Sequence, residues 1–280
     1  MRVAIIGYGF VGKALEFGLK DNVETFKVDP KLGTEIYDLV DFKPDVCFVC
    51  VPTPMNDDGT QNISILQDVT KEITKLSISS LIVLKSTVLP KYFTELKKLI
   101  PNIIYNPEFL RERSANEDFI NSELIIFGGQ KEYTEDLAKF YKNHTNCVNQ
   151  TYQHTDLISA SLIKYSINTF LATKVTFFNE LYKLFKKSGS SDSWDDIVEI
   201  ISIDKRIGPS HMQVPGHDGK FGFGGACFPK DAQALFLYSD EVNAPMTLLK
   251  KAIENNNAIR NNYDSISKRE LEQNINYSDD

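Results

Sequence analysis

The sequence predicts an α/β protein in which a doubly wound parallel sheet is followed by an all-helical domain with a long central helix. Three observations lead to this fold class. Short apolar runs alternate with helical segments from residue 1 to about residue 150. A glycine-rich turn, Gly7-Tyr-Gly-Phe-Val-Gly12, separates the first apolar run from the first helical segment. The stretch from His154 to Lys187 has no Gly or Pro and carries apolar residues at helical intervals.

The first part of the chain is expected to form one domain over residues 1–152. Its apolar runs predict strands at residues 2–6, 23–28, 46–50, 81–86, 102–105 and 123–127. Helical spacing between them predicts helices at residues 10–20, 63–76, 91–99 and 131–143. Strands that alternate with helices are typical of a parallel sheet covered on both faces.

The second part, residues 153–280, is expected to be a helical domain. One helix of about thirty residues is predicted within 154–187, well above the usual length of about 11–12. A helix this long needs partners for its apolar faces, so we expect it to join the domains and to form a homodimer contact. Further helices are predicted at residues 193–202, 229–240 and 245–262. The tail from Ile266 is polar and has little to bury, so we expect its end to be frayed.

Composition excludes several classes of protein. A formal net charge of −7 argues against a nucleic-acid-binding surface. No apolar run approaches the ~20 residues that span a bilayer, and the chain enters its first strand at once, which leaves no room for a signal peptide. Four cysteines in 280 residues do not make a disulfide framework, so we expect a reducing cytoplasm.

Cys47 and Cys50 form a C-x-x-C pattern inside an apolar strand, residues 45–51. No second cysteine pair or nearby histidine completes a metal site. We therefore expect core packing for these thiols and no metal.

The turn at Gly7-Tyr-Gly-Phe-Val-Gly12 follows a strand and precedes a helix, which makes it the G-x-G-x-x-G fingerprint of Rossmann-type dinucleotide-binding domains. Gly7 is expected to form the tight turn, Gly9 to let a pyrophosphate approach, and Gly12 to let helix and strand pack. The pyrophosphate is expected at the helix N-terminus. Asp29 ends the second strand, where its carboxylate would accept hydrogen bonds from the ribose and repel a 2′-phosphate. NAD is therefore favoured over NADP, although nearby Lys31 weakens this preference.

A second motif, residues 221–231, sets Cys227 in a glycine-dense loop that ends in Pro229, Lys230 and Asp231. Glycine allows positive φ or close approach to a ligand, and proline suits the first turn of a helix. A thiol just before a helix N-terminus and beside a lysine is favoured to ionise and act as a nucleophile. The alternative is a tight turn with a buried cysteine.

Other polar residues follow the strand ends, where an open α/β sheet binds its ligands. These loops are Val51-Pro-Thr-Pro54, Ser86-Thr-Val88 and Asn106-Pro-Glu-Phe-Leu-Arg-Glu112. In the long helix, Lys164 and Asn168 lie four apart and so share a face. Taken singly, Thr87 could be an N-cap, Glu108 a surface carboxylate and Lys164 a solvated lysine. Together with the Cys227 loop they predict an active site.

These motifs resemble those of the UDP-glucose/GDP-mannose 6-dehydrogenase family. The resemblance runs from the N-terminus to about residue 260 and adds Lys164-Tyr-x-x-Asn168 and Arg206-Ile-Gly208 to the motifs above. It implies NAD-dependent, two-step oxidation of the C6 alcohol of a nucleotide sugar to a carboxylate, with two NAD per turnover. UDP-glucose is the first substrate to expect, and polysaccharide biosynthesis the general context.

The resemblance implies a role for six catalytic residues: Cys227, Lys164, Asn168, Glu108, Asp231 and Thr87. Lys164 and Asn168 would stabilise the oxyanion of the first step, and the lysine would help to move the proton. Cys227 would attack the aldehyde to give a thiohemiacetal and then a thioester. Glu108 would act as the base for hydrolysis, while Thr87 and Asp231 orient water or side chains.

The fingerprint and the resemblance together imply two sets of binding residues. The cofactor set is Gly7, Tyr8, Gly9, Phe10, Val11, Gly12, Asp29, Val51, Pro52, Thr53, Ser86, Thr87, Glu108 and Lys230. The substrate set is Phe109, Leu110, Arg111, Lys164, Asn168, Arg206, Phe221, Gly224 and Cys227. The backbone around Phe109–Arg111 would hold the diphosphate, and Arg206 would reach a substrate in the neighbouring subunit.

Two features depart from the family. Members usually continue into a second Rossmann-like domain that binds the nucleotide, whereas this chain ends near the point where that domain would begin. Arg113 stands where the family commonly has glycine, so it could alter the substrate loop or contact a phosphate.

Two other functions remain open from the sequence. A single-step β-hydroxyacid-type dehydrogenase shares the fold plan and a helix-borne lysine but needs no cysteine. A catalytically weak NAD-binding subunit would use the long helix for assembly. The Cys227 loop argues against the first, and the full set of catalytic residues argues against the second.

Overall fold

The structure, a computed structural model, describes residues 1–277. Its internal contacts form two compact units. Unit 1 comprises Met1–Thr53 and Asn62–Lys164, and unit 2 comprises Pro54–Gln61 and the chain from Tyr165 onward. The domain boundary expected at residues 152/153 stays a prediction.

Unit 1 is built on one seven-stranded sheet. Its strands are β1 (Arg2–Ile6), β2 (Glu24–Val28), β3 (Val46–Val49), β4 (Leu81–Leu84), β5 (Ile104–Tyr105), β6 (Ile125–Gly128) and β7 (Tyr152–Thr155). The strand order is β2-β1-β3-β4-β5-β6-β7, which is the doubly wound arrangement predicted from the sequence. Each of the six predicted strands is present.

Two features of the sheet differ from the prediction. The sheet is not wholly parallel, because β5 and β6 pair in antiparallel fashion through Tyr105 and Gly128. An antiparallel strand starts at the end of the sheet where the previous strand finished, so the chain needs no crossover between them. The seventh strand, β7, was not predicted because its sequence, Tyr-Gln-His-Thr, is polar and lacks an apolar run. As an edge strand paired only with β6, it does not need one.

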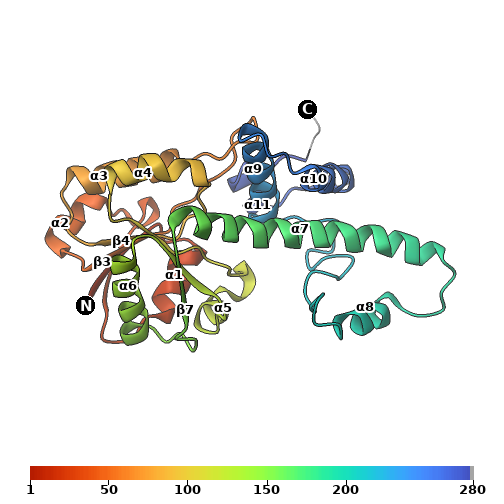
Figure 1. The fold of residues 1–280 in the computed structure, drawn as a ribbon, viewed down its shortest axis with the longest axis horizontal. Helices are drawn as coiled ribbons and strands as arrows, with labels where there is room; N and C mark the ends of the chain where they lie inside the picture. The colour runs from red at the N-terminus through yellow and green to blue at the C-terminus, as the bar shows by residue number, and fades with distance from the viewer. Residues whose placement is uncertain (278–280) are drawn as a thin grey trace. The chain divides into compact units, whose positions relative to one another are not determined.

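Helices cover both faces of this sheet. They are α1 (Phe10–Gly18), α2 (Leu39–Phe42), α3 (Ser64–Lys75), α4 (Phe93–Leu99), α5 (Ala115–Ile120) and α6 (Lys131–His144). Helices α3 and α4 lie on one face, and α1, α5 and α6 on the other (Figure 1). Four of the six helices were predicted, whereas α2 and α5 are too short to give a clear helical period. Short 3₁₀ helices occupy Pro30–Leu32, Ile36–Asp38, Pro90–Tyr92 and Glu112–Ser114.

The period-2 alternation of the strands produces two separate apolar layers. In β1, Ala4 and Ile6 face the layer that contains residues of α3 and α4. Val3 and Ile5 face the layer that contains residues of α1, α5 and α6. Because both faces are buried, β3, β4 and β6 are apolar throughout. The carboxyl ends of the parallel strands β1–β5 lie at one edge of the sheet, and polar loops follow them.

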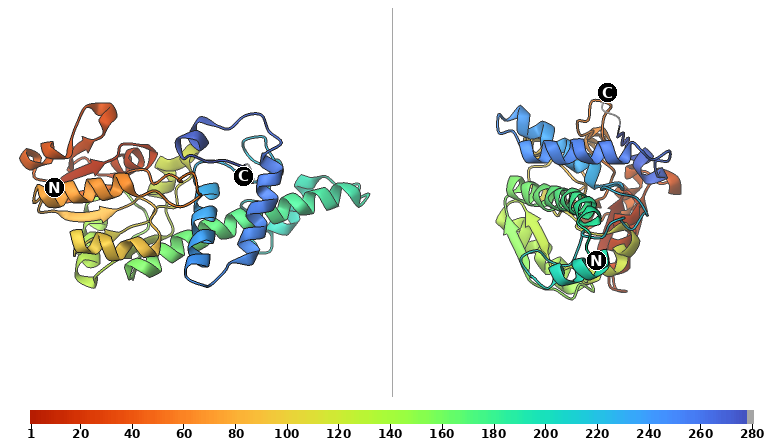
Figure 2. Two further views of the ribbon diagram at one scale, coloured as in Figure 1. Left: turned by 90° about the horizontal axis from the view of Figure 1, so that it is seen from above. Right: turned by 90° about the vertical axis from the view of Figure 1, so that its right-hand side faces the viewer.

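Unit 2 is helical, as predicted. Helix α7 (Leu157–Lys187) has 31 residues; it begins in unit 1 and continues through unit 2. The other helices are α8 (Trp194–Ser202), α9 (Phe228–Glu241), α10 (Thr247–Arg260) and α11 (Lys268–Glu272). Helices α9 and α10 lie across α7 (Figure 2). A small core joins Phe178 of α7 to Trp194 and Val198 of α8.

The polar tail that was expected to have little to bury does not behave that way. The chain forms α11, and Ile275 and Tyr277 are only 3% and 5% exposed. The expectation is therefore wrong for Glu270, Gln273, Ile275 and Tyr277, which are buried, whereas most other residues of 266–277 are exposed. The fraying expected at the very end falls on residues 278–280, which lie outside the described residues.

The cysteines in β3 and after it pack as predicted. Cys47 is fully buried and Cys50 is partly buried, and both are free thiols. Burial raises the pKa of each thiol to about 12, so neither is reactive at neutral pH. Residues 1–277 contain no cluster of three His, Cys, Asp or Glu that could bind a metal. Within the same residues, no helix combines the length and the apolar character that crossing a membrane requires.

Candidate active site

The glycine turn after β1 has the geometry of a dinucleotide-binding fingerprint. Gly7 has φ +90°, and its N–H donates to Val28 O at 2.8 Å. A Cβ on Gly12 would lie 2.4 Å from Gly7 O and 3.0 Å from Ile5 Cγ2, so only glycine lets α1 pack this closely on β1. A Cβ on Gly9 would meet no atom within 4 Å. The three glycines thus separate into one turn, one packing contact and one open position that fits a pyrophosphate.

Asp29, at the end of β2, is fastened to this turn. Its Oδ2 accepts a hydrogen bond from Tyr8 N at 2.7 Å, and its Oδ1 accepts one from Lys31 N at 2.9 Å. The carboxylate therefore lies beside the glycine turn, where a ribose contact is expected. That contact itself stays a prediction.

The loops after β3 and β4 are bound to each other. Thr53 Oγ1 donates to Thr87 O at 2.9 Å, and Ser86 Oγ donates to Val51 O at 2.7 Å. Val51, Thr53 and Ser86 are buried, whereas Pro52 is exposed. These hydrogen bonds hold the two loops together at the carboxyl edge of the sheet.

Glu108 and Lys164 form a buried pair in unit 1. They are 8% and 3% exposed, so Glu108 is not the surface carboxylate of the alternative interpretation. Lys164 Nζ donates to Glu108 O at 2.5 Å and lies 3.6 Å from Glu108 Oε1. It also lies 5.2 Å from the centre of the Phe109 ring. A buried carboxylate and ammonium must be paired, and such a pair can exchange a proton with a bound reactant.

Lys85, the last residue before Ser86, was missed by the sequence analysis. It is 4% exposed, and its Nζ donates to Asn106 Oδ1 at 2.9 Å. Burial lowers the pKa of its ammonium group. Asn106 Nδ2 in turn donates to Ile126 O at 3.0 Å, so Lys85 holds the start of the loop that carries Glu108. A lysine directly after the apolar run of β4 was the available signal.

The same loop lines a small hollow in unit 1. Its lining includes Lys85, Asn106, Glu108, Tyr141 and Cys147. Tyr141 Oη donates to Asn106 Oδ1 at 2.6 Å. The hollow thus has a lysine, a carboxylate and an amide on its wall, together with apolar side chains such as Phe109 and Phe119.

The backbone N–H groups expected to bind the diphosphate donate to carboxylates of the protein itself. Leu110 N donates to Glu108 Oε2 at 2.6 Å, and Arg111 N donates to Asp118 Oδ2 at 2.8 Å. The Arg111 guanidinium binds the same carboxylate in a bidentate way, and this pairing lowers the pKa of Asp118. A diphosphate at this loop would have to displace one of these carboxylates. Arg113 is exposed in the adjacent 3₁₀ helix.

In unit 2 a buried carboxylate lies at the start of α9. Asp231 is 1% exposed. Its Oδ2 accepts a hydrogen bond from Asn168 Nδ2 at 2.7 Å, and its Oδ1 accepts one from Lys230 Nζ at 2.6 Å. Asp231 N donates to Cys227 O at 2.9 Å. The aspartate therefore fixes both the amide of Asn168 and the first turn of α9.

Cys227 is the N-cap residue of α9, and Pro229 lies in the first turn, as the sequence predicted. Cys227 is partly exposed, as is Cys50, whereas Cys47 and Cys147 are buried. The preceding loop is held by side chains: Gly222 N donates to Asn179 Oδ1 at 2.9 Å, and Phe221 N donates to Tyr263 Oη at 2.8 Å. A partly exposed thiol at a helix N-terminus is placed to act as a nucleophile.

Arg206 lies on the surface of unit 2. Its guanidinium is paired with Asp204, and its side chain is 89% exposed. Lys174 of α7, which the sequence analysis did not single out, donates to Ile207 O at 2.9 Å and to Gly208 O at 3.1 Å. The loop is thus fixed while the guanidinium extends outward.

The structure joins some of the predicted site residues directly. Glu108 meets Lys164 within unit 1, and Asp231 meets both Asn168 and Lys230 within unit 2. Lys164 and Asn168 lie one turn apart on α7. The contacts of the remaining residues with cofactor and substrate stay predictions.

Two regions of the chain match two domains of one known protein family. Residues 13–145 match the NAD-binding domain of the UDP-glucose/GDP-mannose dehydrogenase family, and residues 158–258 match its central domain. A UDP-glucose 6-dehydrogenase of Rickettsia felis is 34% identical over 233 residues, which are 80% of this chain and 50% of that protein. One of Bacillus subtilis is 31% identical over 261 residues, which are 88% of this chain and 56% of that protein. The chain thus spans about half the length of these relatives.

A solved structure agrees with the fold. The UDP-glucose dehydrogenase of Pyrobaculum islandicum superposes with a TM-score of 0.74 and 25% sequence identity. The match covers 92% of this chain and 68% of that one.

The glycine turn yields a test that separates folding from cofactor binding. Gly12→Ala places a methyl group against the backbone of Gly7, and overpacking of this kind costs about 1–3 kcal/mol, so the melting temperature should fall. Gly9→Ala meets open space and should leave the melting temperature unchanged. It should nevertheless weaken NAD binding by about tenfold or more, equivalent to about 1.4 kcal/mol.

Thermal unfolding without ligand and titration calorimetry with NAD give the two readouts. NAD binding by Gly9→Ala with the affinity of the unsubstituted protein would show that the open position does not receive the pyrophosphate.

Proposed function

Because the chain belongs to the UDP-glucose/GDP-mannose dehydrogenase family, we propose that it is an NAD-dependent dehydrogenase that oxidises the C6 alcohol of a nucleotide sugar to a carboxylate. The observation that carries this proposal is the partly exposed Cys227 at the N-terminus of α9. A single oxidation of an alcohol has no use for such a thiol, whereas oxidation through the aldehyde to the acid can use it to form a covalent intermediate. UDP-glucose is the proposed substrate, since relatives with this substrate in their names match most of the chain.

Bound NAD supplies the hydride acceptor for both oxidations. In the first, Lys164 accepts or relays the proton of the C6 hydroxyl, and Asn168 stabilises the oxygen as it gains charge. Burial supports these roles, since Lys164 and Asn168 are only 3% and 7% exposed. Hydrogen bonds to a developing oxyanion are stronger away from water.

In the second oxidation, the Cys227 thiolate adds to the aldehyde carbon and forms a C–S bond, which gives a thiohemiacetal. Loss of hydride from this carbon, and of the hydroxyl proton, gives a thioester. Water then attacks the thioester, the C–S bond breaks, and the carboxylate and the free thiol are released. Glu108 is the proposed base for that water, while Thr87 and Asp231 orient water and side chains.

The thiol chemistry also keeps the reactive aldehyde from escaping, since the carbon stays covalently bound between the two oxidations. A reducing cytoplasm, in which Cys227 would remain a thiol, stays a prediction.

The yield of NADH tests the proposal directly. We expect two NADH for each UDP-glucose consumed, measured by absorbance of NADH against chromatographic quantification of the sugar nucleotide. One NADH per substrate molecule would instead support a single-step hydroxyacid-type dehydrogenase. A complete lack of NADH with every sugar nucleotide in a screen would support a catalytically silent subunit.

Substitutions separate the two halves of the reaction. Cys227→Ser should stall at the alcohol or aldehyde stage, since a serine hydroxyl is a far weaker nucleophile at neutral pH. Glu108→Gln should slow hydrolysis by about 10²–10⁴-fold, so that a thioester accumulates on Cys227 and is detected by mass spectrometry of the intact protein. Cys147→Ser and Glu112→Gln are the matched controls and should turn over normally. Normal turnover by both test variants would show that the assigned roles are wrong.

We further propose that two copies of the chain pair along α7. Phe170, Phe177 and Leu184 follow one another at intervals of seven residues and are 66%, 58% and 65% exposed. A seven-residue apolar repeat forms a single stripe along a helix and is typical of helix pairing. A second copy would present the same stripe and bury it symmetrically.

Light scattering coupled to size-exclusion chromatography tests this pairing. The protein should have about twice the mass of one 31.7-kDa chain, and a Phe170→Glu/Phe177→Glu variant should have the mass of one chain. Lys183→Ala, an exposed change on the same helix, should leave the mass unchanged. A double variant that keeps the mass of two chains would exclude α7 as the interface.

A further inference from the structure

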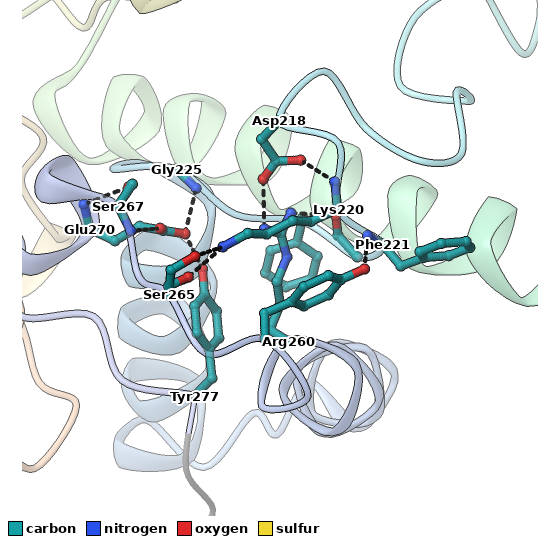
Figure 3. A network of polar contacts seen from close by, with 12 residues as sticks. Asp218, Lys220, Phe221, Gly225, Arg260, Ser265, Ser267, Glu270 and Tyr277 are labelled. Carbon is teal, nitrogen blue, oxygen red and sulfur yellow. Dashed lines mark hydrogen bonds and ion pairs between the residues drawn. The ribbon is translucent and has the colours of Figure 1, made fainter.

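The segment Ser267–Tyr277, which we call the clasp, is polar, yet Glu270, Gln273, Ile275 and Tyr277 are buried in it. Glu270 and Gln273 are 3% and 6% exposed, and Tyr277 is 5% exposed. Few apolar residues drive this burial, so polar contacts must hold the segment in place. Hydrogen bonds from Ser267, Tyr277 and Gly225 meet at the Glu270 carboxylate, and Gly225 belongs to the glycine loop that precedes Cys227 (Figure 3).

Glu270 is the centre of the clasp. Its Oε1 accepts hydrogen bonds from Gly225 N at 3.0 Å and from Tyr277 Oη at 2.6 Å. Its Oε2 accepts one from Ser267 N at 2.8 Å, within the capping box of α11. Burial alone would raise the pKa of this carboxyl group, but the hydrogen bonds from Tyr277, Ser267 and Gly225 lower it to about 2. Glu270 is therefore an anion at neutral pH, and its contact with Gly225 is charge-assisted.

The Glu270 carboxylate lies so close to Gly224 that a side chain at this position would clash with it. A Cβ at Gly224 would lie 2.8 Å from Glu270 Oε1 and 2.7 Å from Arg260 Nη1. Gly225 has φ +80°, which favours glycine for a second reason. Glu270 can thus approach the loop because position 224 lacks a side chain, whereas glycine at position 225 is favoured by its backbone conformation alone.

The loop is held from a second side by α10. Arg260 Nη2 donates to Gly222 O at 2.7 Å, and Arg260 Nη1 binds Asp218 Oδ2 at 2.6 Å. Asn256 bonds both the N–H and the C=O of Phe223, at 2.6 Å and 3.0 Å. Residues 222 and 223 are therefore fixed by α10, whereas Gly225 is fixed by the clasp.

The clasp is itself anchored at its other end. Met55 N donates to Gln273 O at 3.1 Å, and Asn274 Nδ2 donates to Asp57 Oδ1 at 2.9 Å. Both partners lie in the 54–61 loop, which belongs to unit 2. The clasp is thus bound to the glycine loop through Glu270 and to the 54–61 loop through Gln273 and Asn274.

We propose that Glu270 is a positioning residue for Cys227, which it fixes by binding the backbone N–H of Gly225. Gly225 lies two residues before the thiol, and Asp231 N holds the Cys227 carbonyl on the other side. The clasp therefore sets where the sulfur stands relative to the first turn of α9 and its neighbour Lys230. The consequence for catalysis rests on the proposed function, whereas the effect on the thiol does not.

Alkylation of Cys227 tests this inference independently of turnover. The rate constant for iodoacetamide is measured from pH 6 to pH 9 by mass spectrometry of the peptide that contains Cys227. Glu270→Ala should change this rate constant by about threefold or more and shift the midpoint of its pH profile, since thiolate stability depends on the helix N-terminus and nearby charges. Besides Glu270, the charged or titratable groups around the loop include Asp218, Lys220, Arg260, Lys230 and Asp231, and His211, whose ring lies 5.4 Å from that of Phe228. None of them is substituted, so the titration of His211 contributes equally to the profile of every variant.

Three further variants make the result decisive. Glu270→Gln keeps an acceptor for Gly225 N and should lie between the alanine variant and the unsubstituted protein. Tyr277→Phe removes one anchor of the carboxylate and should act in the same direction, and it serves if Glu270→Ala does not fold. Glu272→Gln, on the same helix, should match the unsubstituted protein.

A purely structural role would overturn the proposal: folded Glu270→Ala and Tyr277→Phe would melt at lower temperature but show the alkylation profile of the unsubstituted protein. A protein that forms no NADH yet shows the expected alkylation shifts would refute the proposed function and leave the positioning role intact. If NADH is formed, the second NADH of each turnover should fall about 10–100-fold in Glu270→Ala, because a misplaced nucleophile slows reaction steeply.

Discussion

The glycine loop before Cys227 depends on the absence of side chains at Gly222 and Gly224. A Cβ on Gly222 would lie only 2.5 Å from Asn256 Oδ1. A Cβ on Gly224 would lie 2.7 Å from Arg260 Nη1 and 2.8 Å from Glu270 Oε1. The loop has no strand partner, so these side chains supply the hydrogen bonds that its buried backbone requires. A glycine loop is usually flexible, but here close approach makes it one of the most heavily bound segments of the unit.

The same physical rule governs the buried charges. Glu108 with Lys164, and Asp231 with Lys230 and Asn168, are almost fully buried and are paired. An unpaired charge in these places would cost several kcal/mol. Pairing therefore keeps the groups in one geometry, which is also the condition for chemistry at a defined atom. The contacts that stabilise these buried charges are therefore also the ones that would fix them for a reaction.

Local sequence patterns were sufficient for most elements. The strands of unit 1 are buried on both faces and so read as short apolar runs, while the unbroken stretch before Lys187 gives α7 almost to its ends. The apolar patterns did not predict elements that are held by polar residues. Strand β7 is a polar edge strand, and the buried residue of α11 is Glu270 rather than its leucine. Lys85 was missed because nothing in the sequence tells that its ammonium group meets Asn106, which follows a different strand.

The sequence by itself determined the order of most strands and helices, the turn at Gly7, the packing contact at Gly12 and the location of Cys227 before a helix. These depend on backbone conformation and on apolar period, which are properties of neighbouring residues. Only the tertiary structure decided that Glu108 is buried against Lys164, that Asp231 binds Asn168, and that Glu270 reaches Gly225. Each of these contacts joins residues 45 or more positions apart, and a carboxylate carries no local signal of which distant donor it will meet.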